Sequence, residues 1–315
     1  MLRTGIYKLN QLNRVASKDV FGKEKNISIY LYQHINKIDN PEKKTQFAEL
    51  ILNRFNSDRN VIKRTYKNRF NNFDNLSINK ISEQNYDRIS ILDVAISDGR
   101  ASCYFLEQSI NQLQNFYYTG SDIHVNYFLN KKDKNDKSYI ITDENKKIIE
   151  ITYPPFVWNL ARSEGGFYFI NNFLKSLFLK KTQAALLNNK NKYQEKIELI
   201  HPDFNALLSK SNSFSLKNFN LFDEISEKYS VIRAMNILHP GYFSKDQLSL
   251  IINNIYNSLE INGLLIEGSN EDAGTVVEGA IYKKSEKGFM LLSEPEKPSR
   301  IKEIVLSFSD NKENG

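Results

Sequence analysis

The chain has 315 residues, of which 40% are hydrophobic and 12% aromatic, so it is long enough to bury one large core or two smaller ones. Its formal net charge is +6, but the lysines alternate with acidic residues and form no basic stripe, which argues against nucleic-acid binding. The lone cysteine, Cys103, excludes a disulfide framework. Because Met1 to Arg14 hold no long apolar run and no stretch of about 18 apolar residues occurs, we expect a cytoplasmic protein without a membrane-spanning helix.

The N-terminal part, residues 1–85, is polar with scattered aromatic side chains, and we predict a helical subdomain here. Residues 27–35 fit either a helix or a strand, because periodicity does not separate the two in a short apolar run. The Asn- and Asp-rich residues 70–79 predict a connector. Apolar side chains at helical spacing predict one amphipathic helix, at Phe47, Leu50, Ile51 and Phe55.

The first strand of the main domain is predicted at residues 89–94, which are nearly continuously aliphatic, as in a strand covered on both faces. Small residues then occupy every second position, at Ala95, Ser97 and Gly99. They allow a ligand to approach the backbone, and Gly99 can take a positive φ without steric cost. Residues 101–113 carry apolar side chains at helical spacing, so the first turn of that helix would point its free N–H groups at the ligand.

A second strand is predicted at residues 116–123, with Asp122 near its end. In a nucleoside or dinucleotide site, an acid at this position accepts hydrogen bonds from ribose hydroxyls, although it could also cap the next helix. Residues 138–190 predict an insertion or lid, made of a β-hairpin and an amphipathic helix at 165–187. We expect that helix to cover the core or the substrate, and its Phe-rich face would also suit a membrane surface.

The remaining residues alternate between strand and helix patterns and end in a hairpin. We predict an α/β fold, a Rossmann-like doubly wound sheet of seven strands with an antiparallel C-terminal β-hairpin, over residues 86–310. A helix is predicted at residues 245–259. The predicted strands and β segments lie at residues 196–200, 229–238, 264–268, 279–284, 288–293 and 304–308.

The first strand and its small-residue turn resemble the first motif of the class I S-adenosylmethionine-dependent methyltransferases. That motif is an aliphatic strand followed by acid-x-Gly-x-Gly-x-Gly. Asp122 matches the ribose-binding acid of the family, residues 229–238 look like its fourth strand, and residues 260–266 are similar to the turn before its fifth strand. The residues at the motif's acid and glycine positions are Asp93, Ala95, Ser97 and Gly99.

Within this superfamily, the order and spacing of the motifs are most similar to those of the chemotaxis-receptor glutamate methyltransferases. The counterparts of their Asn-Leu-Leu, Arg-Asn-Val-Leu and Tyr-Phe segments begin at Asn220, Met235 and Tyr242. Met235 replaces the arginine of that subfamily. The resemblance spans about residues 86–308 for fold and cofactor, and it does not extend to a substrate.

The resemblance implies S-adenosylmethionine as cofactor and methyl transfer to a small-molecule or protein acceptor, with no metal. A general base is needed only if the acceptor must lose a proton, and the candidates are His239 and Tyr242, followed by Glu267 and Glu271. The implied cofactor-binding residues are Asp93, Ala95, Ser97, Gly99, Asp122, Asn220, Leu221 and Asn236.

Two other functions are alternatives to methyl transfer. A nicotinamide-dependent oxidoreductase needs Gly-x-Gly-x-x-Gly after the first strand, and Gly99 is the only glycine in this turn. A catalytically inactive methyltransferase-like module, kept for binding or regulation, is the stronger alternative. The two replaced glycines and the replacement at Met235 favour it.

Overall fold

The structure is a computed structural model that describes two compact units of the chain. It describes residues 29–53, 65, 67–153, 193–270 and 276–308, the short strand segments 6–8, 56–58, 61–62 and 156–159, and positions 173, 176, 177, 179 and 180. Unit 1 comprises Met1–Arg64 and His124–Pro202, and unit 2 comprises Thr65–Ile123 and Asp203–Gly315. The limits of these units differ from the predicted domains, 1–85 and 86–310, and the predicted domains stay a prediction. Most of the helix predicted at 165–187 lies outside the described residues.

Unit 1, as far as it is described, contains a six-stranded antiparallel sheet in the order β1-β9-β8-β7-β6-β10. Its core joins this sheet to a 3₁₀ helix, η2, and to helix α2 through buried side chains such as Leu31, Ile51 and Leu129. The helix predicted at Phe47, Leu50 and Ile51 is found as α2, while Phe55 of the same prediction lies outside the described residues. The predicted hairpin is found as β7 and β8. The elements are β1 (Ile6–Lys8), η2 (Ile29–Lys37), α2 (Pro41–Leu52), β6 (Asn126–Lys131), β7 (Tyr139–Asp143), β8 (Ile148–Tyr153), β9 (Phe156–Asn159) and β10 (Tyr193–Glu198), with a separate two-stranded sheet of β2 (Asn56–Asp58) and β3 (Val61–Ile62).

The described part of unit 2 holds an eight-stranded sheet, in which seven strands follow the order β11-β5-β4-β12-β13-β14-β15 and the short β16 pairs with β14. The strands from β11 to β13 are parallel, and β14 and β15 form the antiparallel end. The predicted α/β sheet with its C-terminal hairpin is therefore confirmed. The strands are β4 (Ile89–Val94), β5 (Phe116–Asp122), β11 (Phe214–Asn218), β12 (Tyr229–Met235), β13 (Leu259–Ser269), β14 (Glu278–Ser285), β15 (Gly288–Ser293) and β16 (Lys297–Pro298).

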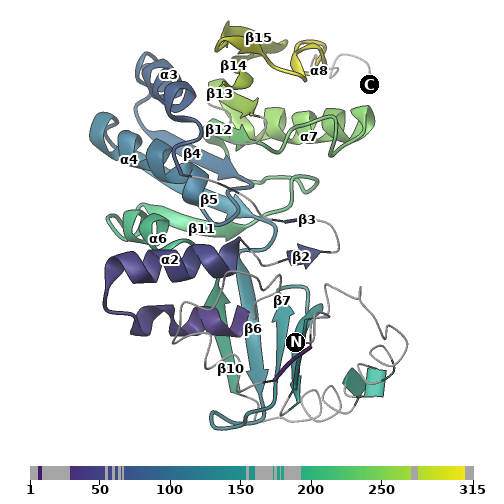
Figure 1. Cartoon of the computed structure of the whole chain (residues 1–315). Coiled ribbons are helices and arrows are strands. Elements are labelled where there is room, and N and C mark those ends of the chain that lie inside the picture. The colour runs from purple at the N-terminus through teal and green to yellow at the C-terminus, as the bar shows by residue number, and fades with distance from the viewer. Residues whose placement is uncertain are drawn as a thin grey trace. The chain divides into compact units, whose positions relative to one another are not determined.

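Helices cover both faces of this sheet, with α3 and α4 on one face and α7 and α8 on the other (Figure 1). The core under α7 and α8 joins Leu92, Ile232 and Leu265 of the sheet to Ile252 and Val305 of the helices. Continuous apolar strands need this cover on both faces. The helices of unit 2 are α3 (Asn71–Ser82), the 3₁₀ turn η3 (Arg100–Ser102), α4 (Cys103–Gln112), α6 (Pro202–Leu208), α7 (Lys245–Ser258) and α8 (Lys302–Leu306).

Two predicted elements are wrong. Residues 70–79 were predicted as a connector but form most of α3, because Phe73, Ile78 and Ile81 bury one face while the Asn residues lie mainly on the other. Residues 304–308 were predicted as a β segment but contribute to α8, where Val305 is the buried side chain of the helix. Within the described part of the chain, every helix is too short or too polar to cross a membrane.

The start of α7 gives a direct test of this fold. The Ser244 side chain accepts a hydrogen bond from the Gln247 N–H at 3.3 Å, and the Gln247 side chain accepts one from the Ser244 N–H at 2.9 Å. Ser244→Ala should therefore lower the free energy of unfolding by about 1 kcal/mol, measured by urea denaturation. Ser249→Ala, at an exposed position of the same helix, is the control and should change it by less than about 0.5 kcal/mol.

Candidate active site

The loop that follows β4 has a repeating left-handed backbone. Ala95 has a φ of 58°, Ser97 of 60° and Gly99 of 84°. A left-handed conformation is free of cost for glycine but costs other residues roughly 1–2 kcal/mol each. The chain therefore keeps, at Ala95 and Ser97, a conformation that glycine would adopt without strain. Such strained positions persist only where the surrounding structure holds them, and they concentrate at functional sites.

Hydrogen bonds to β5 hold this loop in place. The Ile96 N–H donates to the Ser121 carbonyl at 3.0 Å, and the Ser97 N–H donates to Asp122 Oδ2 at 2.8 Å. The Ser97 Oγ atom is buried and has no hydrogen-bond partner within the described residues. The loop thus places a buried hydroxyl, without a partner among the described residues, beside the Asp122 carboxylate at the end of β5.

Polar side chains end several neighbouring strands at the same edge of the sheet. Asp122 ends β5 and lies in register with Asn218, which ends β11. Asn236 follows β12 with a φ of 57°, and its Oδ1 accepts a hydrogen bond from the Asn270 N–H at 3.0 Å. Arg69 Nε donates to Asn270 Oδ1 at 2.9 Å. From β4 the chain builds the sheet first toward β5 and β11 and then, on the other side, toward β12 and β13. Open α/β sheets bind ligands at the carboxyl ends of the strands where this change of direction occurs.

Asp93, predicted at the cofactor, lies in a buried charged cluster beneath the loop. Its two carboxylate oxygens are 3.0 and 3.1 Å from Arg233 Nη1, and the Tyr118 hydroxyl donates to Oδ2 at 2.8 Å. Burial, followed by the charge of Asp93, raises the pKa of Tyr118 well above its usual value, so the hydroxyl keeps its proton and donates it. Asp93 is 1% exposed, and its predicted role at the cofactor stays a prediction.

The same arginine pairs with a second carboxylate, Asp74 of α3, through Nη2 and Oδ1 at 2.8 Å. Burial raises the pKa of Asp74 to about 6, against the opposing charge of Arg233. Burial disfavours the charge on Arg233, but Asp74 and then Asp93 outweigh it and raise the pKa of the guanidinium above its ordinary value. Arg233 and Asp74 were not among the predicted site residues, because nothing in the local pattern of either segment links them.

The residues predicted beside adenine lie in a turn after β11. Asn220 Oδ1 accepts a hydrogen bond from the Phe222 N–H at 3.2 Å. Leu221 is partly buried against the core under α7, and its carbonyl accepts from the Asn254 side chain at 3.3 Å. Their contact with adenine stays a prediction. Asn218, two residues earlier, ends β11 next to Asp122 and is not among the predicted site residues.

The predicted candidates for a general base lie in different surroundings. His239 Nδ1 accepts from the Gly241 N–H at 2.9 Å, and its Nε2 lies 2.8 Å from Arg300 Nη1. Tyr242 is 68% exposed, with its ring centre 5.5 Å from that of His239. The catalytic roles of His239 and Tyr242 stay predictions, and Glu271 lies outside the described residues.

Glu267, the remaining candidate, is buried in β13, and burial raises the pKa of its carboxyl to about 8. The Tyr282 hydroxyl lies 3.5 Å from Glu267 Oε1. The carboxyl is therefore mostly protonated at neutral pH, which disfavours a role as a base there. No group of three or more His, Cys, Asp or Glu side chains within the described residues is arranged to hold a metal ion.

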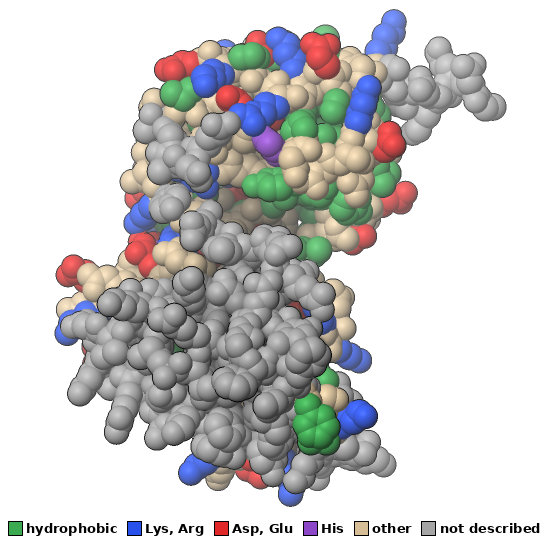
Figure 2. Space-filling view, turned by 45° about the vertical axis from the view of Figure 1, so that its right-hand side comes forward, with side chains coloured by type: hydrophobic (Ala, Val, Ile, Leu, Met, Phe, Trp, Pro, Cys, Tyr) green, Lys and Arg blue, Asp and Glu red, His purple; other side chains and the backbone are tan. Residues whose placement is uncertain are grey.

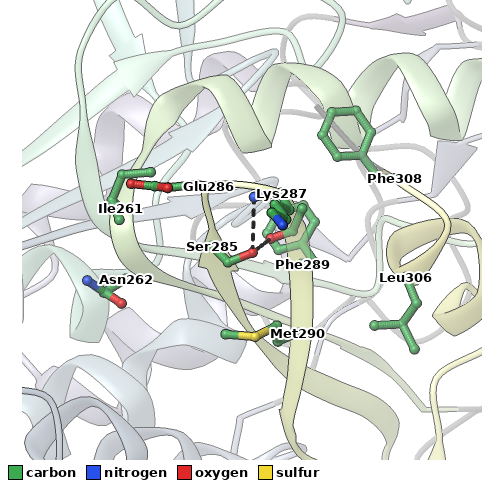
Figure 3. Close-up of a pocket in the computed structure, with 10 residues that line it drawn as sticks. Ile261, Asn262, Ser285, Glu286, Lys287, Phe289, Met290, Leu306 and Phe308 are labelled. Atoms are coloured by element: carbon green, nitrogen blue, oxygen red, sulfur yellow. Dashed lines mark hydrogen bonds between the residues drawn. The ribbon is translucent and has the colours of Figure 1, made fainter. Parts of the chain in front are cut away.

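A pocket of about 690 Å³ lies elsewhere in unit 2, between the start of β13, the β14/β15 hairpin and the residues after α8 (Figure 3). Ile261, Met290, Leu306 and Phe308 supply apolar walls, and Lys287 stands at the hairpin tip. None of the predicted site residues lines this pocket. Figure 2 shows that hydrophobic side chains are also exposed on the face of unit 2 that it presents, so an apolar surface does not by itself mark the site.

Comparisons with known proteins add structures but no sequence family. No family model matches the chain. No curated protein matches its sequence. The solved structures that are similar include the citrinin polyketide synthase CMeT domain (10% identity, TM-score 0.28, 60% of this chain and 31% of that one). A putative O-methyltransferase from Nostoc punctiforme PCC 73102 matches at 10% identity and a TM-score of 0.30, over 63% of this chain and 36% of that one.

A TehB-like SAM-dependent methyltransferase from Corynebacterium glutamicum is also similar, at 12% identity and a TM-score of 0.27, over 62% of this chain and 63% of that one. The chain spans only about a third of the length of the first two structures, 31% and 36%. Scores this low carry no argument about the present chain, so its fold and site stand on their own geometry. The predicted resemblance to the chemotaxis-receptor branch gains no support from these comparisons.

Gly99 is the one position of the loop where glycine is required. A Cβ atom there would lie 2.1 Å from Phe204 Cδ1 of α6, and its φ of 84° is left-handed. Gly99→Ala should therefore lower the free energy of unfolding by about 3 kcal/mol, measured by urea denaturation. The double variant Gly99→Ala/Phe204→Leu relieves the clash but not the backbone strain. Its free energy of unfolding should fall by less than the sum of the decreases in the two single variants. Strictly additive decreases would contradict the contact between Gly99 and Phe204.

Glu267 predicts a pH dependence of stability. Its pKa is raised to about 8 in the folded state, so its stabilising contribution is complete below the unfolded pKa near 4.5 and is lost as the pH rises through about 8. The free energy of unfolding should fall by roughly 2–4 kcal/mol more between pH 5 and pH 9 in the wild type than in Glu267→Gln. Equal pH profiles for the two proteins would show that Glu267 is not held protonated.

Proposed function

We propose that unit 2 is an S-adenosylmethionine-dependent methyltransferase whose cofactor binds at the carboxyl ends of β4, β5 and β12. The observation that carries the proposal is the backbone of the loop after β4. In the methyltransferase motif that the sequence resembles, three glycines follow the acid at every second position. Here Ala95, Ser97 and Gly99 take left-handed conformations at those three positions, although only one of them is glycine.

The residues present fit the cofactor in chemical terms. A ribose offers two hydroxyl donors, and the Asp122 carboxylate at the end of β5 is an acceptor of the type that binds them. The buried Ser97 hydroxyl, which has no partner within the described residues, can bond to a polar group of the ligand. When bound, the cofactor supplies a methyl group on a sulfonium that is already activated for transfer.

The chain's own residues would align and enclose the reactants. Ser97 and Asp122 are tied to each other at 2.8 Å, so the loop and the end of β5 form one preorganised surface. Hydrogen bonds from Arg69 to Asn270 and from Asn270 to Asn236 fix the backbone at the carboxyl ends of β12 and β13. We propose a small molecule or a protein as acceptor, and His239 or Tyr242 as the residues to test for proton transfer if the acceptor requires it.

The backbone of the loop argues against an inactive module. That alternative rests on the loss of two glycines, but Ala95 and Ser97 have the same left-handed backbone as Gly99. The inactive module would bind the cofactor without transferring its methyl group. Cofactor binding and methyl transfer must therefore be measured separately.

Cofactor binding is tested with S-adenosylhomocysteine, the demethylated product. At millimolar ligand we expect the melting temperature of the wild-type protein to rise by about 5 °C, because ligand binding stabilises the folded state. Asp122→Ala should abolish this rise, since it removes both the acceptor for ribose and the acceptor for the Ser97 N–H.

Asp87→Ala is the matched control, because Asp87 is an exposed acid just before the amino end of β4. It should leave the rise unchanged. No rise for the wild type at millimolar ligand would contradict the proposed function, and an equal rise in Asp122→Ala would place the ligand elsewhere.

A further inference from the structure

Arg233 lies inside the sheet, in the middle of β12, with 1% of its side chain exposed. Arginine is almost never fully buried unless it is paired. Here the guanidinium lies 4.7 Å from the ring centre of Phe105 in α4 and 5.8 Å from that of Phe70. Its ion pairs with Asp93 and Asp74 join β12 to β4 and to α3.

Asp93 is two residues before the first strained position of the loop, Ala95. Arg233 Nη1 contacts both of its carboxylate oxygens, and the Tyr118 hydroxyl of β5 adds a third contact. The strand end from which the loop departs is therefore fixed by two neighbouring strands. A strained loop keeps its conformation only when its surroundings determine it, so this anchor bears directly on Ala95 and Ser97.

The other guanidinium nitrogen of Arg233, Nη2, pairs with Asp74 of α3. Asp74 lies in the first turn of α3, five residues after Arg69. Arg69 donates from Nε to Asn270 at 2.9 Å, and the Asn270 N–H donates to Asn236 at 3.0 Å. The segment leading into α3 thus extends to the carboxyl ends of β12 and β13. One guanidinium therefore connects the loop after β4 with the segment that carries Arg69.

A buried ion cluster is weak support for stability in itself, because desolvation opposes the attraction between the charges. What the cluster supplies is a fixed geometry. We infer that Arg233 is a positioning residue for the cofactor site: it holds the loop through Asp93 and the Arg69 segment through Asp74, without touching the ligand. The inference rests on the proposed function of that site.

The test compares Arg233→Met with Leu248→Ala, which opens a cavity under α7 in the core on the other face of the sheet. The affinity for S-adenosylhomocysteine is measured by isothermal titration calorimetry. Arg233→Met should weaken binding at least tenfold, whereas Leu248→Ala should change it less than threefold. Arg233→Lys should give an intermediate loss, because one ammonium group lacks the fork that reaches both carboxylates.

Equal affinities of Arg233→Met and Leu248→Ala would overturn the inference. If Arg233→Met does not fold, the affinity of Tyr118→Phe for S-adenosylhomocysteine is measured in its place. This variant removes only the hydroxyl that donates to Asp93, and it should weaken binding about threefold. Wild-type affinity in Tyr118→Phe would then overturn the inference.

Failure of the wild type to bind S-adenosylhomocysteine would refute the proposed function but leave the positioning role open to a second readout. Amide hydrogen exchange at Ser97 reports the loop without a ligand. Faster exchange at Ser97 in Arg233→Met than in Leu248→Ala would support the positioning role. If Arg233→Met does not fold, Tyr118→Phe takes its place in this comparison. Equal exchange rates would overturn it.

Discussion

The salt bridge between Arg233 and Asp93 sets the geometry on which the carboxyl edge of unit 2 depends. Both side chains lie inside a parallel sheet whose other central residues are largely apolar, and each is 1% exposed. A charge in such a place is costly unless it is paired and hydrogen-bonded. Asp74 adds a second ion pair and Tyr118 a hydrogen bond, so four elements meet at one cluster: α3, β4, β5 and β12.

The loop above this cluster repeats a left-handed backbone at three alternate positions, although only one of them is glycine. Glycine is required at Gly99, where the Phe204 ring leaves no room for a Cβ atom. At Ala95 and Ser97 the left-handed backbone costs conformational strain that glycine would avoid. Ser97 also adds a hydroxyl that glycine could not offer. The hydrogen bond from Ser97 to Asp122 then links the loop to the second strand of the sheet.

The sequence predicted the parts of this fold that follow from local pattern. Strands β4 and β12 and residues 264–266 of β13 are rich in aliphatic side chains, and α7 shows helical spacing, so both kinds of element were predicted. Helix α3 was missed because its many Asn and Asp residues resemble a connector, while its apolar face is only a few residues wide. The buried charged cluster was predicted only in part for a different reason. Asp93 lies in the predicted loop motif, whereas Arg233 and Asp74 are 159 residues apart and meet only through the fold.

The proposed ligand site lies at the loop after β4. Amide NMR spectra of the protein during a titration with S-adenosylhomocysteine test this location residue by residue. We predict shifts of the Ala95, Ser97 and Asp122 amide signals, with the signals of Gly288 and Met290 in the β14/β15 hairpin unchanged. Shifts at the hairpin pocket alone, or no shifts at millimolar ligand, would contradict the account.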